Sequence, residues 1–414
     1  MRRLDLAPVP TTWKGLEAIA FKSLYAKEIY DAPTDDGWVL RISRYRPKPQ
    51  RWEQPIFGAP LLLVPGWSQN RHAFTCGAFV KQLLAYGADV HILELRGHGK
   101  SSRKLQSERG LKPADLEFGW DLDGYFLHDV PAGVQAVKRR TGRRKIVFVG
   151  ASMGGMLGYG YAGCHDDLAG LVTIGAPSDL GRGFLGLRAL ALLGPAVFAP
   201  VIDALCRGMS GVARTRHGAA GVLRRVRLER LAERLSPRGA PYRPVRFDYM
   251  PMDAVLRALA GAATEPNLRR FQRVARSSGF LLNPARIAAH DLRWLLAQGG
   301  EKEPRRVVEQ FARWIRSDEM KCYRTGYDYK AHFKDIRVPM AIFFGDMDKI
   351  ASWRSTRGVR EGVRSDYLVC HAVKENSHLL TVGPDVHQIC AEICELVEHA
   401  ARRTILFGEP GRAC

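Results

Sequence analysis

The chain has 414 residues, more than the ~100–200 of one ordinary domain, so we expect two domains or one core with a large insertion. Its composition, 46% hydrophobic and 25% charged, excludes a disordered, collagen-like or coiled-coil protein. The formal net charge of +21 raises the expectation of an anionic partner such as nucleic acid, a lipid surface or a charged substrate, and has no bearing on the fold.

Patterns typical of strands and helices alternate through the first part of the chain. Two alternating runs, 26–29 and 38–44, flank a polar turn and predict a β-hairpin. The continuous apolar run at 61–64 is typical of a strand buried on both faces of a parallel sheet. The same patterns predict helices over 79–86 and 125–140 and strands over 89–94, 145–149 and 168–174. This alternation indicates an α/β fold with a doubly wound, mostly parallel sheet.

The pattern changes at residue 179. Residues 179–330 are rich in Ala, Leu and Arg and have mostly helical spacing, with no convincing parallel strand. Strand–helix alternation then resumes, with strands predicted over 339–344 and 366–373 and a closing helix over 385–402. We therefore expect one core in two pieces, residues 1–178 and 331–414, interrupted by a helical cap of residues 179–330.

The strongest local motif is G-x-S-x-G at residues 150–154 (GASMG), between a predicted strand and a predicted helix. Glycines two residues before and after Ser152 allow the sharp turn that lifts a serine hydroxyl above a sheet. The following helix N-terminus adds N–H donors and a positive potential. The alternative is a glycine-rich structural turn. We interpret Ser152 as a catalytic nucleophile.

A serine nucleophile needs a base, and the chain order Ser, Asp, His provides a test. Asp348 follows the strand at 339–344, and His378 follows the strand at 366–373. In this scheme His378 takes the proton of Ser152, and Asp348 orients the imidazole. The alternatives are Asp346 and, less favoured, Asp179 for the acid, with His371 and His387 flanking the same region.

The developing oxyanion of an acyl-transfer reaction needs N–H donors. The backbone N–H of Met153, which follows the serine, is the first. The N–H of Trp67, in the loop after the strand at 61–64, is the second, although an ordinary Pro-Gly turn would also explain this loop. Arg96 and His98, in a Gly-rich turn that lacks phosphate-loop spacing, are interpreted as structural.

These motifs occur in an order that resembles the α/β-hydrolase superfamily. The stretches concerned are VPGWS, ELRGHGKS, GASMGG, GDMD and NSHLL, and the likeness covers about 1–178 and 331–414. Two further stretches, APTDDGWVLRISR and GYFLHDVPAGVQAVKRRTG, resemble the acid lipase branch in particular. The resemblance implies a serine hydrolase with a cap at the insertion. Pro65 stands where that branch usually has His before the loop glycine, which leaves the backbone donors intact.

No cofactor and no metal are expected, because the triad needs neither and none of the eight cysteines has CxxC or zinc-site spacing. Scattered reduced thiols, the absence of an apolar leader and the absence of an 18-residue apolar run predict a cytoplasmic protein, with peripheral membrane contact as an option.

We predict hydrolysis of a carboxylic ester or thioester of a hydrophobic acid. Candidate walls of an acyl pocket are the apolar stretch 184–205, Trp294, Phe311 and Trp314. The alternative is that these residues only pack the cap on itself. An acyltransferase with the same triad is the alternative, and a non-catalytic membrane- or nucleic-acid-binding protein is least favoured.

The positive charge is concentrated in the insertion. Residues 179–330 carry a net +14 of the total +21, including the run at 224–227 and the pair at 269–270. A solvated helix face would explain this charge. The alternative is that the insertion guides an anionic substrate or contacts anionic lipid. Nucleic acid is not an expected partner, and the oligomeric state is left open.

Overall fold

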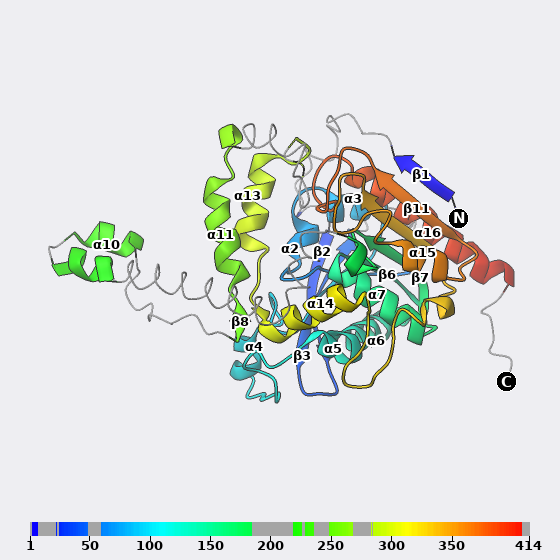
Figure 1. Cartoon of the computed structure of the whole chain (residues 1–414), viewed down its shortest axis with the longest axis horizontal. Helices are drawn as coiled ribbons and strands as arrows, with labels where there is room; N and C mark the ends of the chain where they lie inside the picture. Colours follow the sequence, from blue (N-terminus) through cyan, green and yellow to red (C-terminus); the bar gives the residue numbers. More distant parts are fainter. Residues whose placement is uncertain are drawn as a thin grey trace.

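The computed structural model describes residues 2–6, 22, 25–48, 59–183, 218–225, 228–235, 248–267, 283 and 285–407. A nine-stranded sheet forms the centre of this part, in the order β1-β11-β10-β7-β6-β4-β5-β3-β2 (Figure 1). Its strands are β1 (Arg2–Leu6), β2 (Tyr25–Pro33), β3 (Val39–Pro47), β4 (Leu61–Val64), β5 (Val90–Glu94), β6 (Ile146–Ala151), β7 (Leu168–Ile174), β10 (Met340–Gly345) and β11 (Leu368–Val373).

The sheet is mostly parallel, with antiparallel pairing only at the edge formed by β2 and β3. Strand β10 pairs in parallel with β7, so the segments before residue 179 and after residue 339 build one sheet. The expected doubly wound α/β architecture is therefore confirmed. Each strand predicted from the sequence is present with ends within a few residues of those expected.

Helices cover both faces of the sheet, as the continuous apolar strands require. Strand β4 is buried along its whole length, with Leu62 and Val64 in one hydrophobic cluster and Leu61 and Leu63 in the other. The first cluster is closed by α6 (Val130–Thr141) and α7 (Met153–Cys164), and the second by α3 (Phe79–Ala85) and α16 (Val386–Phe407). The carboxyl ends of β4, β6, β10 and β11 consequently meet at one edge between two helical layers.

The described part of the insertion is mainly helical. Helices α11 (Met252–Ala262) and α13 (Ala289–Gln298) lie side by side next to the sheet in Figure 1. Its other elements are η4 (Leu180–Arg182), α10 (Glu229–Leu235), β8 (Tyr249–Met250), β9 (Glu303–Pro304) and α14 (Arg305–Ser317), with β8 and β9 paired antiparallel. The stretch 184–205 and the pair 269–270 lie outside the described residues. The cap boundaries at 179 and 330 stay a prediction.

Two features of the core were not expected from the sequence. Strand β1 pairs in parallel with β11 at the sheet edge, where Arg2 lies opposite Val369, although RRLDL has no apolar alternation that would predict a strand. The helix predicted at 125–140 begins with a π-helical turn, η3 (Tyr125–Asp129), after the short helix α5 (Leu122–Gly124). Such turns often occur at functional or strained positions, and spacing alone does not signal them.

Several short elements complete the core. They are α2 (His72–Thr75), α4 (Arg103–Glu108), η5 (Phe333–Asp335) and α15 (Arg357–Gly362). Among the described residues, no helix has both the length and the apolar character needed to cross a bilayer.

Candidate active site

Ser152 occupies the junction between β6 and α7. Its backbone has φ 51° and ψ −119°. A residue with a side chain adopts such a positive φ only at a cost of about 1–3 kcal/mol. The turn is held by hydrogen bonds from the Ser152 N–H to the carbonyl of Ile174 and from the Gly155 N–H to the carbonyl of Ser152. This is the strained strand-to-helix turn that the G-x-S-x-G motif predicts.

The motif glycines are required by close backbone approach. A Cβ atom on Gly150 would lie 2.3 Å from the carbonyl oxygen of Gly154, across the turn. A Cβ atom on Gly154 would lie 2.1 Å from the carbonyl oxygen of Val64, at the end of the neighbouring strand β4. Because real Cβ atoms do not come this close, neither position accepts a side chain without displacing the elbow.

The structure brings Ser152, His378 and Asp348 into one line of hydrogen bonds. The Nε2 atom of His378 lies 2.9 Å from the Oγ atom of Ser152, and its Nδ1 atom lies 2.9 Å from Oδ2 of Asp348. The second carboxylate oxygen of Asp348 accepts the backbone N–H groups of Ile350 and Ala351, at 2.7 and 2.9 Å. Asp348 is buried, which fixes its orientation toward the imidazole.

The competing acids lie elsewhere. Asp346 is exposed. Asp179 is buried, but its carboxylate binds Lys330 Nζ at 2.8 Å and the N–H of Gly358, and these contacts lower its pKa against the effect of burial. Of the three candidates, only Asp348 contacts His378, as the sequence favoured.

The competing histidines also have other contacts. The His371 ring stacks on Phe343, and its pKa is lowered to about 4 by burial. His387 contacts the carbonyl of Pro384 at 2.5 Å. These contacts do not bring His371 or His387 to Ser152.

The loop that carries His378 is anchored by a buried polar chain. Asn376 donates to Asp385 at 2.6 Å, and Arg286, from the insertion, pairs with the other oxygen of Asp385 at 2.6 Å. The loop also packs closely on the end of β10, because a Cβ atom on Gly345 would lie 2.3 Å from the carbonyl of Asn376. The imidazole is thus placed by tertiary contacts as well as by its own strand.

The loop after β4 lies directly beside the nucleophile. A Cβ atom on Gly66 would be 3.0 Å from the Cβ atom of Ser152, so the backbone of this loop approaches the serine closely. Within the described part of the chain, neither the Trp67 N–H nor the Met153 N–H donates to a protein acceptor. The two predicted oxyanion donors therefore flank Ser152, one on the adjacent loop and one at the start of α7.

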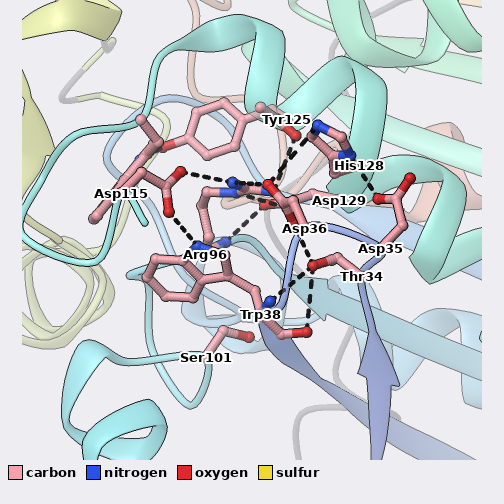
Figure 2. Close-up of polar contacts among 12 residues, drawn as sticks. Thr34, Asp35, Asp36, Trp38, Arg96, Ser101, Asp115, Tyr125, His128 and Asp129 are labelled. Carbon is pink, nitrogen blue, oxygen red and sulfur yellow. Dashed lines mark hydrogen bonds and ion pairs between the residues drawn. The ribbon is translucent and has the colours of Figure 1, made fainter. Parts of the chain in front are cut away.

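Arg96 is the centre of a buried ion-pair cluster and is not at the serine (Figure 2). Its guanidinium contacts Asp36 at 2.7 Å, Asp115 at 2.8 Å and Asp129 at 2.7 Å. These carboxylates come from the β2–β3 turn, the loop after α4 and η3, respectively. Arg96 consequently ties three segments together, in agreement with the structural role inferred from the sequence.

Three potential metal-ligand atoms lie close together at the edge of the Arg96 cluster. They belong to Asp35, Asp36 and His128 and lie within 4.8 Å of one another (Figure 2). Asp36 already pairs with Arg96, and the His128 Nδ1 atom contacts Asp35 at 2.5 Å. The positive charge of the Arg96 guanidinium beside a carboxylate oxygen of Asp36 would repel a bound cation. The contacts of these residues therefore fit a role in holding the β-hairpin turn better than a role in binding a metal.

The aromatic residues expected in an acyl pocket have different surroundings. Trp314 is fully buried between α14 and the core, packs on Phe126 and Phe311, and donates its indole N–H to the carbonyl of Lys321. Trp294 is 41% exposed and meets the ring of His72 edge to face. Trp314 and Phe311 thus pack the insertion on the core, which differs from the expected packing of the cap on itself.

A second group of polar residues surrounds the Trp67 loop and was not predicted from the sequence. Ser68, Asn70, Glu301 and Glu303 form hydrogen bonds between this loop and the insertion. These partners are separated by more than 230 residues, and no motif or periodicity connects them. Only tertiary structure could reveal this link.

Comparison with known proteins agrees with the geometry. A family model described as the alpha/beta hydrolase fold matches residues 59–191. This match covers about a third of the chain, which is therefore similar to the α/β-hydrolase superfamily in this part. The solved structure of DcsB with its substrate analogue has the same fold, with a TM-score of 0.51 and 12% identity over 91% of this chain and 99% of that chain. An α/β-hydrolase fold explains why the serine, acid and histidine follow successive strands at one sheet edge.

The curated relatives of this chain include a lipase and a lipase-like protein. Human lipase member N is 25% identical over 36% of this chain and 38% of its own length. A tear acid lipase-like protein of Mesocricetus auratus is 26% identical over 35% of this chain and 37% of its own length. The chain thus matches less than half the length of either curated relative.

Proposed function

We propose that this chain is a serine hydrolase that cleaves a carboxylic ester or thioester of a hydrophobic acid. The observation that carries the proposal is the pair of 2.9 Å contacts from His378, one to the Ser152 hydroxyl and one to the Asp348 carboxylate. An adjacent oriented base is what makes a serine hydroxyl nucleophilic at neutral pH. The lipase names of two low-identity relatives support ester chemistry and a hydrophobic acyl group.

The proposed reaction has two halves. In the first, Ser152 attacks the carbonyl carbon while His378 takes its proton and then returns it to the departing alcohol or thiol. In the second, His378 accepts a proton from water, which attacks the acyl-enzyme, and then returns this proton to the Ser152 oxygen as the acid leaves. Asp348 stabilises the imidazolium in both halves. The N–H groups of Trp67 and Met153 stabilise the oxyanion.

The test is steady-state hydrolysis of a p-nitrophenyl ester series of increasing chain length. We expect the wild-type chain to release p-nitrophenol and Ser152→Ala to lose at least about 10³-fold in kcat, as removal of a triad nucleophile does. Product analysis with an added alcohol separates hydrolysis from acyl transfer. Activity that Ser152→Ala leaves unchanged would remove the proposal.

We further propose that the insertion contacts anionic lipid. In its described part, Leu228 and Leu231 are about half exposed and lie close in sequence to the exposed Arg225 and Arg230. Exposed apolar side chains with basic neighbours are typical of segments that lie in a membrane interface. Co-sedimentation with phosphatidylserine vesicles that weakens at high salt, and none with phosphatidylcholine vesicles, is the expected result. Equal sedimentation with both would contradict it.

A further inference from the structure

The loop that carries Trp67 is bonded to the insertion along its length. The Ser68 hydroxyl donates to the carbonyl of Glu301 at 2.5 Å, and the Glu301 N–H donates back to the carbonyl of Ser68 at 2.9 Å. The Asn70 side chain donates to Gln298 and to the Glu301 carboxylate at 2.9 and 2.6 Å. A short antiparallel bridge between Gln69 and Gly300 completes this contact. Residues 298–303 therefore form a seat for the loop.

Glu303 is the charged end of this seat and is fully buried. Its carboxylate accepts the backbone N–H of Ser68 at 2.9 Å and the hydroxyl of Tyr125 at 2.7 Å. The imidazole of His98 lies 3.2 Å from the oxygen that Ser68 contacts. Three groups from three separate core segments thus surround one carboxylate that the insertion supplies.

The peptide that Glu303 holds is the one between Trp67 and Ser68. Ser68 has φ 55°, a left-handed conformation that costs a residue with a side chain about 1–2 kcal/mol. Such a conformation persists only where the surroundings fix it. The carboxylate fixes it here, because it accepts the N–H of this peptide while the Glu301 carbonyl accepts the Ser68 hydroxyl.

We propose that Glu303 is a positioning residue that sets the direction of the Trp67 N–H, so that the insertion helps to build the oxyanion hole. This inference rests on the proposed function, in which that N–H stabilises the oxyanion. Glu303 acts through Ser68 and contacts none of Ser152, His378 and Asp348 among the hydrogen bonds of the described residues. A loss of this contact would weaken transition-state stabilisation and leave the nucleophile and its base in place.

The test is Glu303→Gln, which keeps the size of the side chain and removes its charge. Because one misdirected oxyanion donor costs up to about 10²–10³-fold in kcat, we expect a loss of about 10–100-fold in kcat for a p-nitrophenyl ester, with KM within about 2-fold. Glu303→Asp, whose carboxylate is one methylene shorter, should lose part of this activity and provides a second variant if Glu303→Gln does not fold.

Asp123→Asn is the matched control. Asp123 is also a fully buried carboxylate that joins the core to the insertion and the segment after α14, through Gln310 at 2.6 Å and the N–H of Tyr323 at 2.8 Å. It does not contact the Trp67 loop through these bonds. We expect a comparable fall in Tm and little change in kcat. If Asp123→Asn lowers kcat as much as Glu303→Gln does, the role of Glu303 is structural only and the proposal fails.

A second measurement reports the oxyanion directly. An alkyl trifluoromethyl ketone forms a tetrahedral oxyanion adduct with an active-site serine, whereas the matching methyl ketone binds largely without one. We expect Glu303→Gln to weaken inhibition by the trifluoromethyl ketone about 10-fold and to leave the methyl ketone unchanged. Equal effects on both would overturn the inference. The proposed hydrolase function would stand even then, provided that the wild-type chain hydrolyses the ester and Ser152→Ala does not.

Discussion

At the scale of single residues, the candidate site depends on which carboxylate faces His378. Asp346 and Asp348 are two residues apart in one turn, and sequence order alone permits either. Asp348 is buried, contacts the imidazole Nδ1 and is held by two backbone N–H groups, whereas Asp346 is exposed. Their opposite environments make the pair a built-in control for the role of the acid.

We expect Asp348→Asn to lower kcat by about 10³–10⁴-fold, because an amide no longer stabilises the imidazolium and favours the wrong tautomer. Asp346→Asn should keep kcat within about 3-fold of wild type, as expected for a surface substitution away from the site. Steady-state kinetics on one ester measures both variants. A larger loss for Asp346→Asn would assign the acid to the other aspartate.

At the scale of elements, buried polar clusters join segments that lie far apart in the sequence. Arg96 connects the β2–β3 turn, the loop after α4 and η3 through three aspartates (Figure 2). Its planar guanidinium donates to all three at once, and the ring of Trp38 lies 5.6 Å from it. Lysine offers a single ammonium group and would leave part of this cluster without a partner.

Arg96→Lys should therefore lower the free energy of unfolding by about 3 kcal/mol, because a buried charge cluster loses partners. Arg109→Lys is the control: Arg109 also pairs with an aspartate, Asp31, but both side chains are more than a third exposed, so we expect a loss under about 1 kcal/mol. Urea unfolding of the three proteins measures the difference. Similar losses for both variants would contradict the structural role of Arg96.

Local patterns predicted the central strands well because strands such as β4 are apolar along their whole length. The helix that ends at Gly142 has an equally clear stop signal. Ser152 and His378 were also predicted from the sequence, because their motifs follow strands in a fixed order; the structure places them in contact, and their catalytic roles stay a proposal. The contacts of Glu303 with the Trp67 loop and the Asn376–Asp385–Arg286 chain were not predicted from the sequence. Their residues come together only through tertiary contacts. Strand β1 was missed because sheet pairing, not its own pattern, places it.

At the scale of the whole molecule, one buried and one partly buried histidine link stability to pH. The pKa of His371 is lowered to about 4 by burial, and that of His72 is lowered to about 4 by burial and nearby cations. Glu392 lies 3.4 Å from the His371 ring, a contact that favours the charged ring, but burial is the stronger effect. The folded chain therefore holds these rings neutral at a pH where an unfolded chain has already bound their protons.

The sign of the pH dependence follows from these lowered pKa values. Above about pH 6.5 the His371 ring is neutral in both the folded and the unfolded state. As the pH falls from about 6.5 to about 4, only the unfolded state binds the proton at this ring, so the free energy of unfolding decreases. His371→Phe, which keeps the stack on Phe343, should reduce the loss between pH 7 and pH 4.5 by about 2 kcal/mol.

Urea unfolding at several pH values measures this loss. His290→Gln, at a ring that is mostly exposed, serves as the control and should follow the wild-type curve. If the stability of His371→Phe also depends on pH as that of the wild type does, burial does not hold the His371 ring neutral in the folded chain.

Ser152 is proposed to be a nucleophile that His378 activates. The most direct measurement is labelling of the native chain with a fluorophosphonate probe, followed by mass spectrometry of the modified peptide. We predict a single modified residue, Ser152, and a labelling rate that falls by at least about 10²-fold in His378→Ala, because removal of the base leaves an unactivated hydroxyl. Labelling at another residue, or at Ser152 with an unchanged rate in His378→Ala, would show that Ser152 is not a nucleophile activated by His378.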